Sequence, residues 1–255
     1  MMRSSIVIEK VVDYVLKLED DYDRGLLKGR FEFFMGNEKL KPIKKNSGLY
    51  VFVNLPFEGE SIELKTDYYH NVKILIDENS VKDKIHVYRL KPSSVYPYFK
   101  NSVNINFSLE LESGEKIEYD DVVIIAYLSG EVDYSARVVE KTEEKCVIKS
   151  TGSKIYIGDE FTCEACKGAI RIIEKDEEDA CKLSFINDIA LSEGDKLYKA
   201  VVTKASNSGN CVLYFNDMYK SSADAKIMIF YKEVFKEVAI KIKENNSYNL
   251  GVVHM

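Results

Sequence analysis

Three histidines, His70, His86 and His254, are the side chains of this chain that could exchange protons near neutral pH. His70 begins the run His-Asn-Val-Lys and His86 begins His-Val-Tyr-Arg, so neither has the spacing of a zinc peptidase. The sequence also contains no nucleophile elbow, phosphate-binding loop or dinucleotide fingerprint. We therefore assign no catalytic residue and no bound cofactor.

Two cysteines separated by two residues, Cys163 and Cys166, are the sharpest candidate for chemistry. This spacing suits a tetrahedral metal site or a redox pair. A zinc knuckle would need a second such pair, whereas Cys146, Cys181 and Cys211 stand apart along the chain. A thioredoxin-like pair would need a βαβ setting, which the sequence does not indicate. We expect buried thiols and assign no metal site, leaving open whether Cys163 and Cys166 bind a metal.

Neighbouring carboxylates occur in polar, turn-like runs such as Asp120-Asp121 and Glu177-Glu178-Asp179. Glycoside hydrolysis needs two carboxyl groups that face each other across a cleft, and adjacent acids do not meet this condition. In the acidic run from Glu19 to Gly25, the glycine does not sit where an EF-hand loop requires it, and no glutamate closes such a loop. We expect a solvated turn there, and we predict that the protein is not an enzyme.

Composition favours strands over helices. The 255 residues include 17 Tyr, 12 Phe and many Val and Ile, but no Trp and only 4 Pro. The net charge is −6, with both signs interspersed, so nucleic acid is not an expected partner. No run of 18 apolar residues predicts a membrane span, and no apolar segment of signal-peptide length opens the chain. These features predict cytoplasmic synthesis, with incorporation into a particle as one option.

The most regular stretch is Ser47–Pro56, where a Ser-Gly turn leads into Leu-Tyr-Val-Phe-Val, a strand of β-branched and aromatic residues. A weaker copy follows at Ser208–Phe215. Other short strands, separated by turn residues, recur at intervals of roughly 8–16 residues, a pattern typical of sandwiches and barrels. We predict an all-β fold of tandem Greek-key β-sandwich units. The run Glu174–Ala180 is one of few candidates for a short helix.

The division into domains follows from prolines and from a repeated glycine turn. Pro92 and Pro97 lie in one segment that favours an extended connection. Similar turns at Gly36, Gly114 and Gly194, almost evenly spaced, suggest three related β units. We expect a first sandwich at 1–95, a linker at 96–102, a second β domain at 103–185 and a third unit at 186–255, with 103–255 forming one domain as the alternative.

Three aromatic residues in this linker, Tyr96, Tyr98 and Phe99, would be costly to leave in water. The favoured interpretation is that they hold one domain against the next. The alternative is that they form a binding site for another protein, and we take these three residues as the candidate interaction residues.

The turn and strand at Ser47–Pro56, followed by Ile62-x-Leu64 and a tyrosine at 68 or 69, resemble the carboxypeptidase regulatory-like, prealbumin-like β-sandwich domain. The resemblance spans about residues 5–95. It implies a seven-stranded Greek-key sandwich without catalysis, used as a spacer, adhesion or assembly module. The segments Arg3–Leu18 and Leu90–Tyr98 are also similar to proteins encoded with phage-tail-like contractile particles.

Two functions follow as expectations. The first is a non-enzymatic structural or assembly protein, a subunit of a phage-tail-like particle, whose partners are other protein subunits or further copies of itself. The alternative is a soluble carbohydrate- or peptide-binding module with a tyrosine-rich surface. Its candidate residues are Tyr22, Tyr68, Tyr69, Tyr96 and Tyr98.

Overall fold

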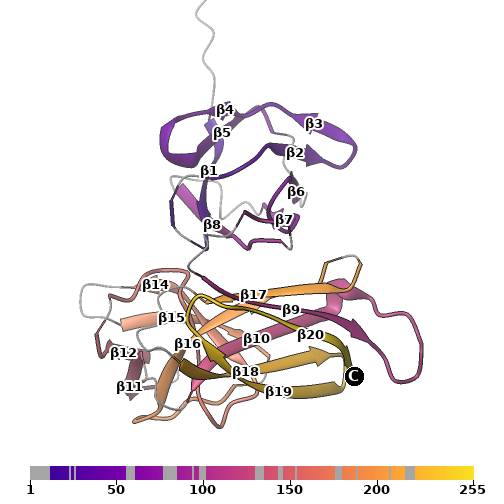
Figure 1. Cartoon of the computed structure of the whole chain (residues 1–255). Helices are drawn as coiled ribbons and strands as arrows, with labels where there is room; N and C mark the ends of the chain where they lie inside the picture. Colours follow the sequence, from indigo (N-terminus) through magenta and orange to yellow (C-terminus); the bar gives the residue numbers. More distant parts are fainter. Residues whose placement is uncertain are drawn as a thin grey trace, which may run out of the picture. The chain divides into compact units, whose positions relative to one another are not determined.

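The structure, a computed structural model, describes residues 12–22, 24–25, 27–55, 61–76, 85–93, 95–97, 102–129, 135–142, 146–152, 154–175, 180–187, 189–206, 208–215 and 222–255. The chain divides into two compact units, unit 1 (Met1–Pro97) and unit 2 (Tyr98–Met255). The division falls inside the segment 96–102 that the prolines marked as a linker. Each unit is described below by itself (Figure 1).

Unit 1 consists of two four-stranded sheets, with strand orders β4-β5-β1-β8 and β3-β2-β6-β7. Its strands are β1 (Val12–Asp20), β2 (Phe31–Met35), β3 (Glu38–Leu40), β4 (Ile43–Lys44), β5 (Leu49–Val53), β6 (Ser61–Thr66), β7 (Val72–Leu75) and β8 (Ile85–Leu90). All paired strands run antiparallel except β1 and β8, which are parallel. The resemblance implied seven strands, whereas eight are described.

The two sheets of unit 1 pack face to face through alternate residues. On β1 the side chains of Tyr14, Leu16 and Leu18 are buried, as expected for a strand with one face against a core. The Phe33 ring of β2 lies 4.8 Å from the Tyr50 ring and 5.3 Å from the Phe52 ring, both on β5 of the other sheet. Unit 1 is therefore a β-sandwich, which confirms the predicted fold class.

Unit 2 holds the other twelve strands that the structure describes. They are β9 (Val103–Glu110), β10 (Val122–Ser129), β11 (Ala136–Lys141), β12 (Cys146–Ser150), β13 (Glu160–Thr162), β14 (Ala169–Lys175), β15 (Ala180–Ile186), β16 (Lys196–Thr203), β17 (Asn210–Phe215), β18 (Ser222–Tyr231), β19 (Val234–Lys243) and β20 (Ser247–His254). The described residues contain no α-helix, only the 3₁₀ turns η1 (Asn46–Gly48) and η2 (Tyr119–Asp121).

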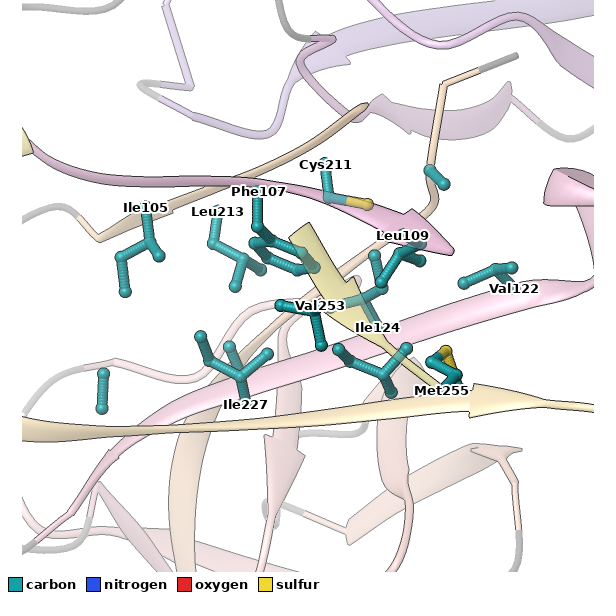
Figure 2. Close-up of a cluster of buried hydrophobic side chains, with 14 of the residues drawn as sticks. Ile105, Phe107, Leu109, Val122, Ile124, Cys211, Leu213, Ile227, Val253 and Met255 are labelled. Atoms are coloured by element: carbon teal, nitrogen blue, oxygen red, sulfur yellow. The ribbon is translucent and has the colours of Figure 1, made fainter. Parts of the chain in front are cut away.

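One half of unit 2 is a second sandwich. A three-stranded sheet, β17-β9-β20, faces a layer in which β10 lies between β16 and β18, and β19 follows β18. Figure 2 shows Ile105, Phe107 and Leu213 of the first sheet pointing toward Ile124 and Ile227 of the second. Strands from both ends of unit 2 share these sheets.

The other half of unit 2 is a closed barrel. The strands β11, β12, β15, β14, β13 and β16 pair in that order, and β11 pairs again with β16. Closure of this kind leaves no free sheet edge. The barrel lies in the chain between β10 and the second half of β16, whose Ala200–Thr203 pair with β10. Residues 103–255 are therefore interwoven, and the boundary expected between 185 and 186 falls inside β15.

Several local expectations differ from the structure. The acidic run from Glu19 to Gly25 is not a solvated turn throughout, because β1 extends to Asp20 and the Asp20 side chain is buried. The candidate helix Glu174–Ala180 is replaced by the end of β14 and the start of β15, with 176–179 outside the described residues. The repeated glycines have unlike surroundings: Gly36 lies in the turn between the paired strands β2 and β3, whereas Gly194 lies before β16, which does not pair with the preceding strand β15.

Candidate interaction surface

Tyr96, the described member of the three candidate interaction residues, is buried with 4% of its surface exposed. Its ring lies 5.4 Å from the rings of both Tyr22 and Tyr69, edge-on in each case. Lys28 Nζ lies 4.5 Å from the centre of the Tyr96 ring and also donates to its hydroxyl. Tyr96 thus attaches the end of unit 1 to its own sandwich. Tyr98 and Phe99 lie outside the described residues, so their role stays a prediction.

The centre of this cluster is the Asp20 carboxylate, at the last position of β1. Its Oδ2 atom accepts hydrogen bonds from the Tyr69 hydroxyl at 2.7 Å and the Tyr96 hydroxyl at 2.5 Å. Its Oδ1 atom accepts from the Tyr22 backbone N–H at 2.8 Å, and Lys28 Nζ lies 3.9 Å from Oδ2. A buried carboxylate needs such donors, since an unpaired buried charge is strongly destabilising.

The Asp20 cluster joins segments that are far apart in the sequence. It links the end of β1 to the loop after β6 and to the segment that follows β8. The sequence did carry a signal for it, because Tyr14, Leu16, Leu18 and Asp20 continue one alternation and so face the same side of β1. The expectation of a solvated turn relied only on the number of acidic residues between Glu19 and Gly25.

Most tyrosines that were candidates for stacking on a sugar are buried in the Asp20 cluster. Tyr22, Tyr69 and Tyr96 are 4%, 3% and 4% exposed and pack on one another. Tyr68 is partly buried, and its carbonyl accepts from the Ser93 N–H at 2.9 Å. The buried tyrosines therefore stabilise unit 1 and present no stacking face to a ligand.

A different surface of unit 1 is apolar and accessible. One row of aliphatic residues crosses the strands β4, β5, β1 and β8. In it Ile43 pairs with Val51, Val51 with Val15, and Val15 with Ile85. Paired residues point to the same side of a sheet, and this side is opposite to the buried Leu16 and Tyr50. We call this surface the outer face. Its aliphatic residues are Val12, Val15, Ile43, Leu49, Val51, Val53, Ile85 and Val87.

The outer face is most exposed along β8. Ile85 is 57% exposed and Val87 50% exposed, and β8 is the last strand in the order of its sheet. A charged group borders this end, where Lys17 Nζ lies 2.6 Å and Arg89 Nε 3.6 Å from Glu19 carboxylate oxygens. Burial raises the pKa of Glu19, but the two cations outweigh it and hold the pKa below its ordinary value of 4.5. Glu19 stays charged at neutral pH.

The residues considered for catalysis are dispersed. The His86 ring stacks on Tyr14 with ring centres 4.6 Å apart, His70 donates its backbone N–H to the Lys91 carbonyl, and His254 lies in β20. In the part of the chain that the structure describes, no group of three or more His, Cys, Asp or Glu side chains is placed to hold a metal ion. No helix within those residues is long and apolar enough to cross a membrane.

The Cys163–Cys166 pair differs from expectation. The two cysteines form a disulfide inside the barrel core instead of remaining thiols. Cys146, Cys181 and Cys211 are buried as thiols. A linked pair does not supply the thiolates that a metal site would require.

Comparison with known proteins gives little further information. No protein family matches the sequence, and no curated protein does. Among solved structures, the Bacillus anthracis TIE protein matches with a TM-score of 0.24 and 10% identity, over 96% of this chain and 50% of that chain. The chain thus spans half the length of that protein. A Streptococcal ancillary pilin matches with a TM-score of 0.21 and 8% identity, over 95% of this chain and 98% of that chain. Similarity at this level does not establish a shared fold.

Proposed function

We propose that this protein is a non-enzymatic structural protein that assembles with other protein subunits through the outer face of unit 1. The observation that carries the proposal is the row Ile43–Val51–Val15–Ile85, which crosses all four strands of one sheet. Ile43 and Ile85, at the two ends of the row, are 42% and 57% exposed. In the next row Lys17 lies between Leu49 and Val87. An apolar row with charges beside it is typical of protein–protein contacts.

The chemistry of the surface indicates the kind of partner. Its residues are aliphatic and mostly β-branched, so they fit another apolar sheet face and offer few hydrogen bonds to a sugar or a nucleotide. The edge strand β8 adds backbone N–H and C=O groups with which a partner's strand can pair. We therefore favour a protein subunit over the carbohydrate-binding alternative. A second copy of this chain is one such subunit.

A finer proposal places the protein in a phage-tail-like particle. It rests on the sequence similarity of Arg3–Leu18 and Leu90–Tyr98 to proteins encoded with such particles. Synthesis in the cytoplasm, where such particles assemble, belongs to the same proposal.

The experiment compares the full chain with the double variant Ile85→Glu and Val87→Glu, both in a native lysate and after purification. Sedimentation followed by electron microscopy should find the wild type in large complexes and the variant near the top of the gradient. Purified wild-type protein should also associate with rising concentration if the partner is a second copy. We expect association to weaken at least about tenfold, because two charges would have to be buried.

A matched control is Leu75→Glu. Leu75 is 75% exposed, but it lies on β7 in the other sheet of unit 1. This variant should sediment as the wild type does. The proposal is refuted if the wild type remains small in both settings, or if Leu75→Glu disrupts the complexes as strongly as the double variant. Complexes that contain no tail-like particles would refute the finer proposal alone.

A further inference from the structure

Four of the five cysteines lie in one place. Cys146, Cys163, Cys166 and Cys181 all belong to the barrel core, and each is at most 9% exposed. The fifth, Cys211, lies in the core of the second sandwich. Cys163 and Cys166 already form a disulfide, so the barrel interior holds one linked pair and two thiols.

The two thiols face each other across a pair of strands. Cys146 on β12 and Cys181 on β15 are direct partners in an antiparallel register. Directly opposed residues have Cα atoms about 4.5–5.5 Å apart and side chains on the same side of the sheet. That separation lies within the range of about 4.4–6.8 Å found for disulfides. Both side chains are buried among the same core residues, so both point into the barrel.

We call the line of pairing between two neighbouring strands a seam, and the β12–β15 seam that these cysteines occupy is short. Among the described residues, β12 and β15 pair at two positions, Cys146 with Cys181 and Val147 with Ala180. The neighbouring seams of the barrel are longer, with five register pairs between β11 and β12 and six between β14 and β15. One of the two pairs that hold this seam is therefore a pair of cysteines.

We propose that Cys146 and Cys181 are a site of oxidative modification, at which a low-molecular-weight disulfide such as oxidised glutathione converts them to a second, cross-strand disulfide. One thiolate of the pair attacks the sulfur–sulfur bond of glutathione disulfide, which forms a mixed disulfide and releases one reduced glutathione. The other thiolate then attacks the protein sulfur of that mixed disulfide and releases the second glutathione. The two cysteines lose two protons and two electrons, and one glutathione disulfide gains them.

Burial sets the conditions for this reaction. It raises the pKa of the Cys146 thiol, and Lys141, its register partner on β11, offsets part of that rise. Both sulfurs are buried, so glutathione disulfide reaches them only while the short β12–β15 pairing is open. Because the thiolate is the attacking species, oxidation is slow at neutral pH and faster in mildly alkaline buffer. The new bond closes a loop between β12 and β15, which restricts the unfolded chain and stabilises the barrel.

The test counts thiols in the full-length protein. The folded chain is incubated with oxidised glutathione at about pH 8.5, a value near the ordinary thiol pKa, and then alkylated in denaturant with N-ethylmaleimide. Three adducts before treatment should become one, on Cys211, since the Cys163–Cys166 pair does not react. Peptide mapping should join Cys146 to Cys181, and the thermal midpoint of unit 2 should rise by roughly 5–10 °C.

Two variants serve as controls. Cys211→Ser removes a buried thiol outside the barrel, so the new disulfide should still form and no adduct should remain. Cys181→Ser should prevent the new disulfide while the Cys163–Cys166 bond persists. The proposal is overturned if three thiols remain after treatment, if glutathione stays attached to Cys146 or Cys181, or if either cysteine becomes linked to Cys163 or Cys166.

Discussion

The two Ser-Gly turns, one in each unit, have the same local geometry. Gly48 and Gly209 have φ values of 75° and 80°, in the left-handed region that favours glycine. In the first turn the Lys45 N–H donates to the Leu49 carbonyl at 2.8 Å, and in the second the Ser206 N–H donates to the Asn210 carbonyl at 2.8 Å. Each turn leads directly into a strand, β5 in unit 1 and β17 in unit 2.

The surroundings of the two turns differ. A Cβ atom on Gly48 would lie 2.5 Å from the Leu18 carbonyl oxygen, which belongs to the backbone of β1. A Cβ atom on Gly209 would lie 2.6 Å from the Tyr119 hydroxyl, at the end of a side chain. Strand β5 has a partner on each side, whereas β17 lies at the edge of its sheet. The same sequence signal thus produces the same turn, but packing decides how strictly the glycine is required.

The largest expected effect comes from placing alanine in these two turns. Gly48→Ala should lower the free energy of unfolding of unit 1 by about 3 kcal/mol or more, because a left-handed alanine is strained and backbone must also move. Gly209→Ala should cost unit 2 about 1–2 kcal/mol, since the Tyr119 ring can shift. Hydrogen exchange of β5 and β17 peptides in increasing urea measures each unit separately.

Gly36→Ala provides the reference for this comparison. Gly36 also has a positive φ, but no atom lies within 4 Å of its Cβ position, so only the backbone strain of about 1–2 kcal/mol should remain. Equal losses at Gly48 and Gly36 would mean that the close approach to β1 contributes nothing.

Local patterns of this kind were predictable from the sequence, and nonlocal pairings were not. The Ser-Gly turns, the strand after Gly48 and the all-β class follow from residue types within a few positions. The closure of the barrel depends on β11 meeting β16, at Ala136 and Leu197, far apart in the sequence. No local pattern encodes that register. The outer face was missed for the same reason, because its row exists only once four strands are aligned.

Asp20 lies two residues beyond the Leu18 carbonyl that approaches Gly48. Asp20→Asn should destabilise unit 1 by about 2–3 kcal/mol, because it weakens hydrogen bonds from two tyrosine hydroxyls to a buried charge. Urea unfolding followed by exchange in β1 and β8 peptides gives the measurement.

The matched control is Asp67→Asn. Asp67 also accepts from a backbone N–H, that of Arg30 at 3.0 Å, and pairs with the Arg30 guanidinium, but its side chain is 42% exposed. Loss of the Asp67 charge should lower the free energy of unfolding of unit 1 by less than about 0.5 kcal/mol, apart from any weakening of the hydrogen bond from the Arg30 N–H. A loss at Asp20 no larger than at Asp67 would show that the buried cluster does not stabilise unit 1.

The smallest effect, about 1 kcal/mol between pH 9 and 10, concerns the residues two positions after each glycine, Tyr50 in unit 1 and Cys211 in unit 2. Burial raises the pKa of Tyr50 above its ordinary value of 10.0, and burial raises the pKa of Cys211 from 9.0 to about 12. A folded state that holds its proton more tightly than the unfolded state loses stability as pH rises between the two pKa values. The contribution of Cys211 to the stability of unit 2 should therefore be complete below about pH 9 and be lost as the pH rises from 9 toward 12.

The slope contributed by Cys211 approaches about 1.4 kcal/mol per pH unit within that window. Tyr127, whose pKa burial raises to about 12, adds its own loss from about pH 10, and Cys146, whose pKa burial also raises, adds one from about pH 9. The Cys211 contribution is therefore taken from the difference between the wild type and Cys211→Ala. Cys211→Ala lowers stability at every pH by leaving a small cavity, but it should flatten the dependence between pH 9 and 10. The measurement is the unfolding free energy of both proteins, obtained from urea unfolding followed by circular dichroism at several pH values between 9 and 10. If the unfolding free energies of the wild type and of Cys211→Ala change equally with pH, the pKa of Cys211 does not differ between the folded and unfolded states.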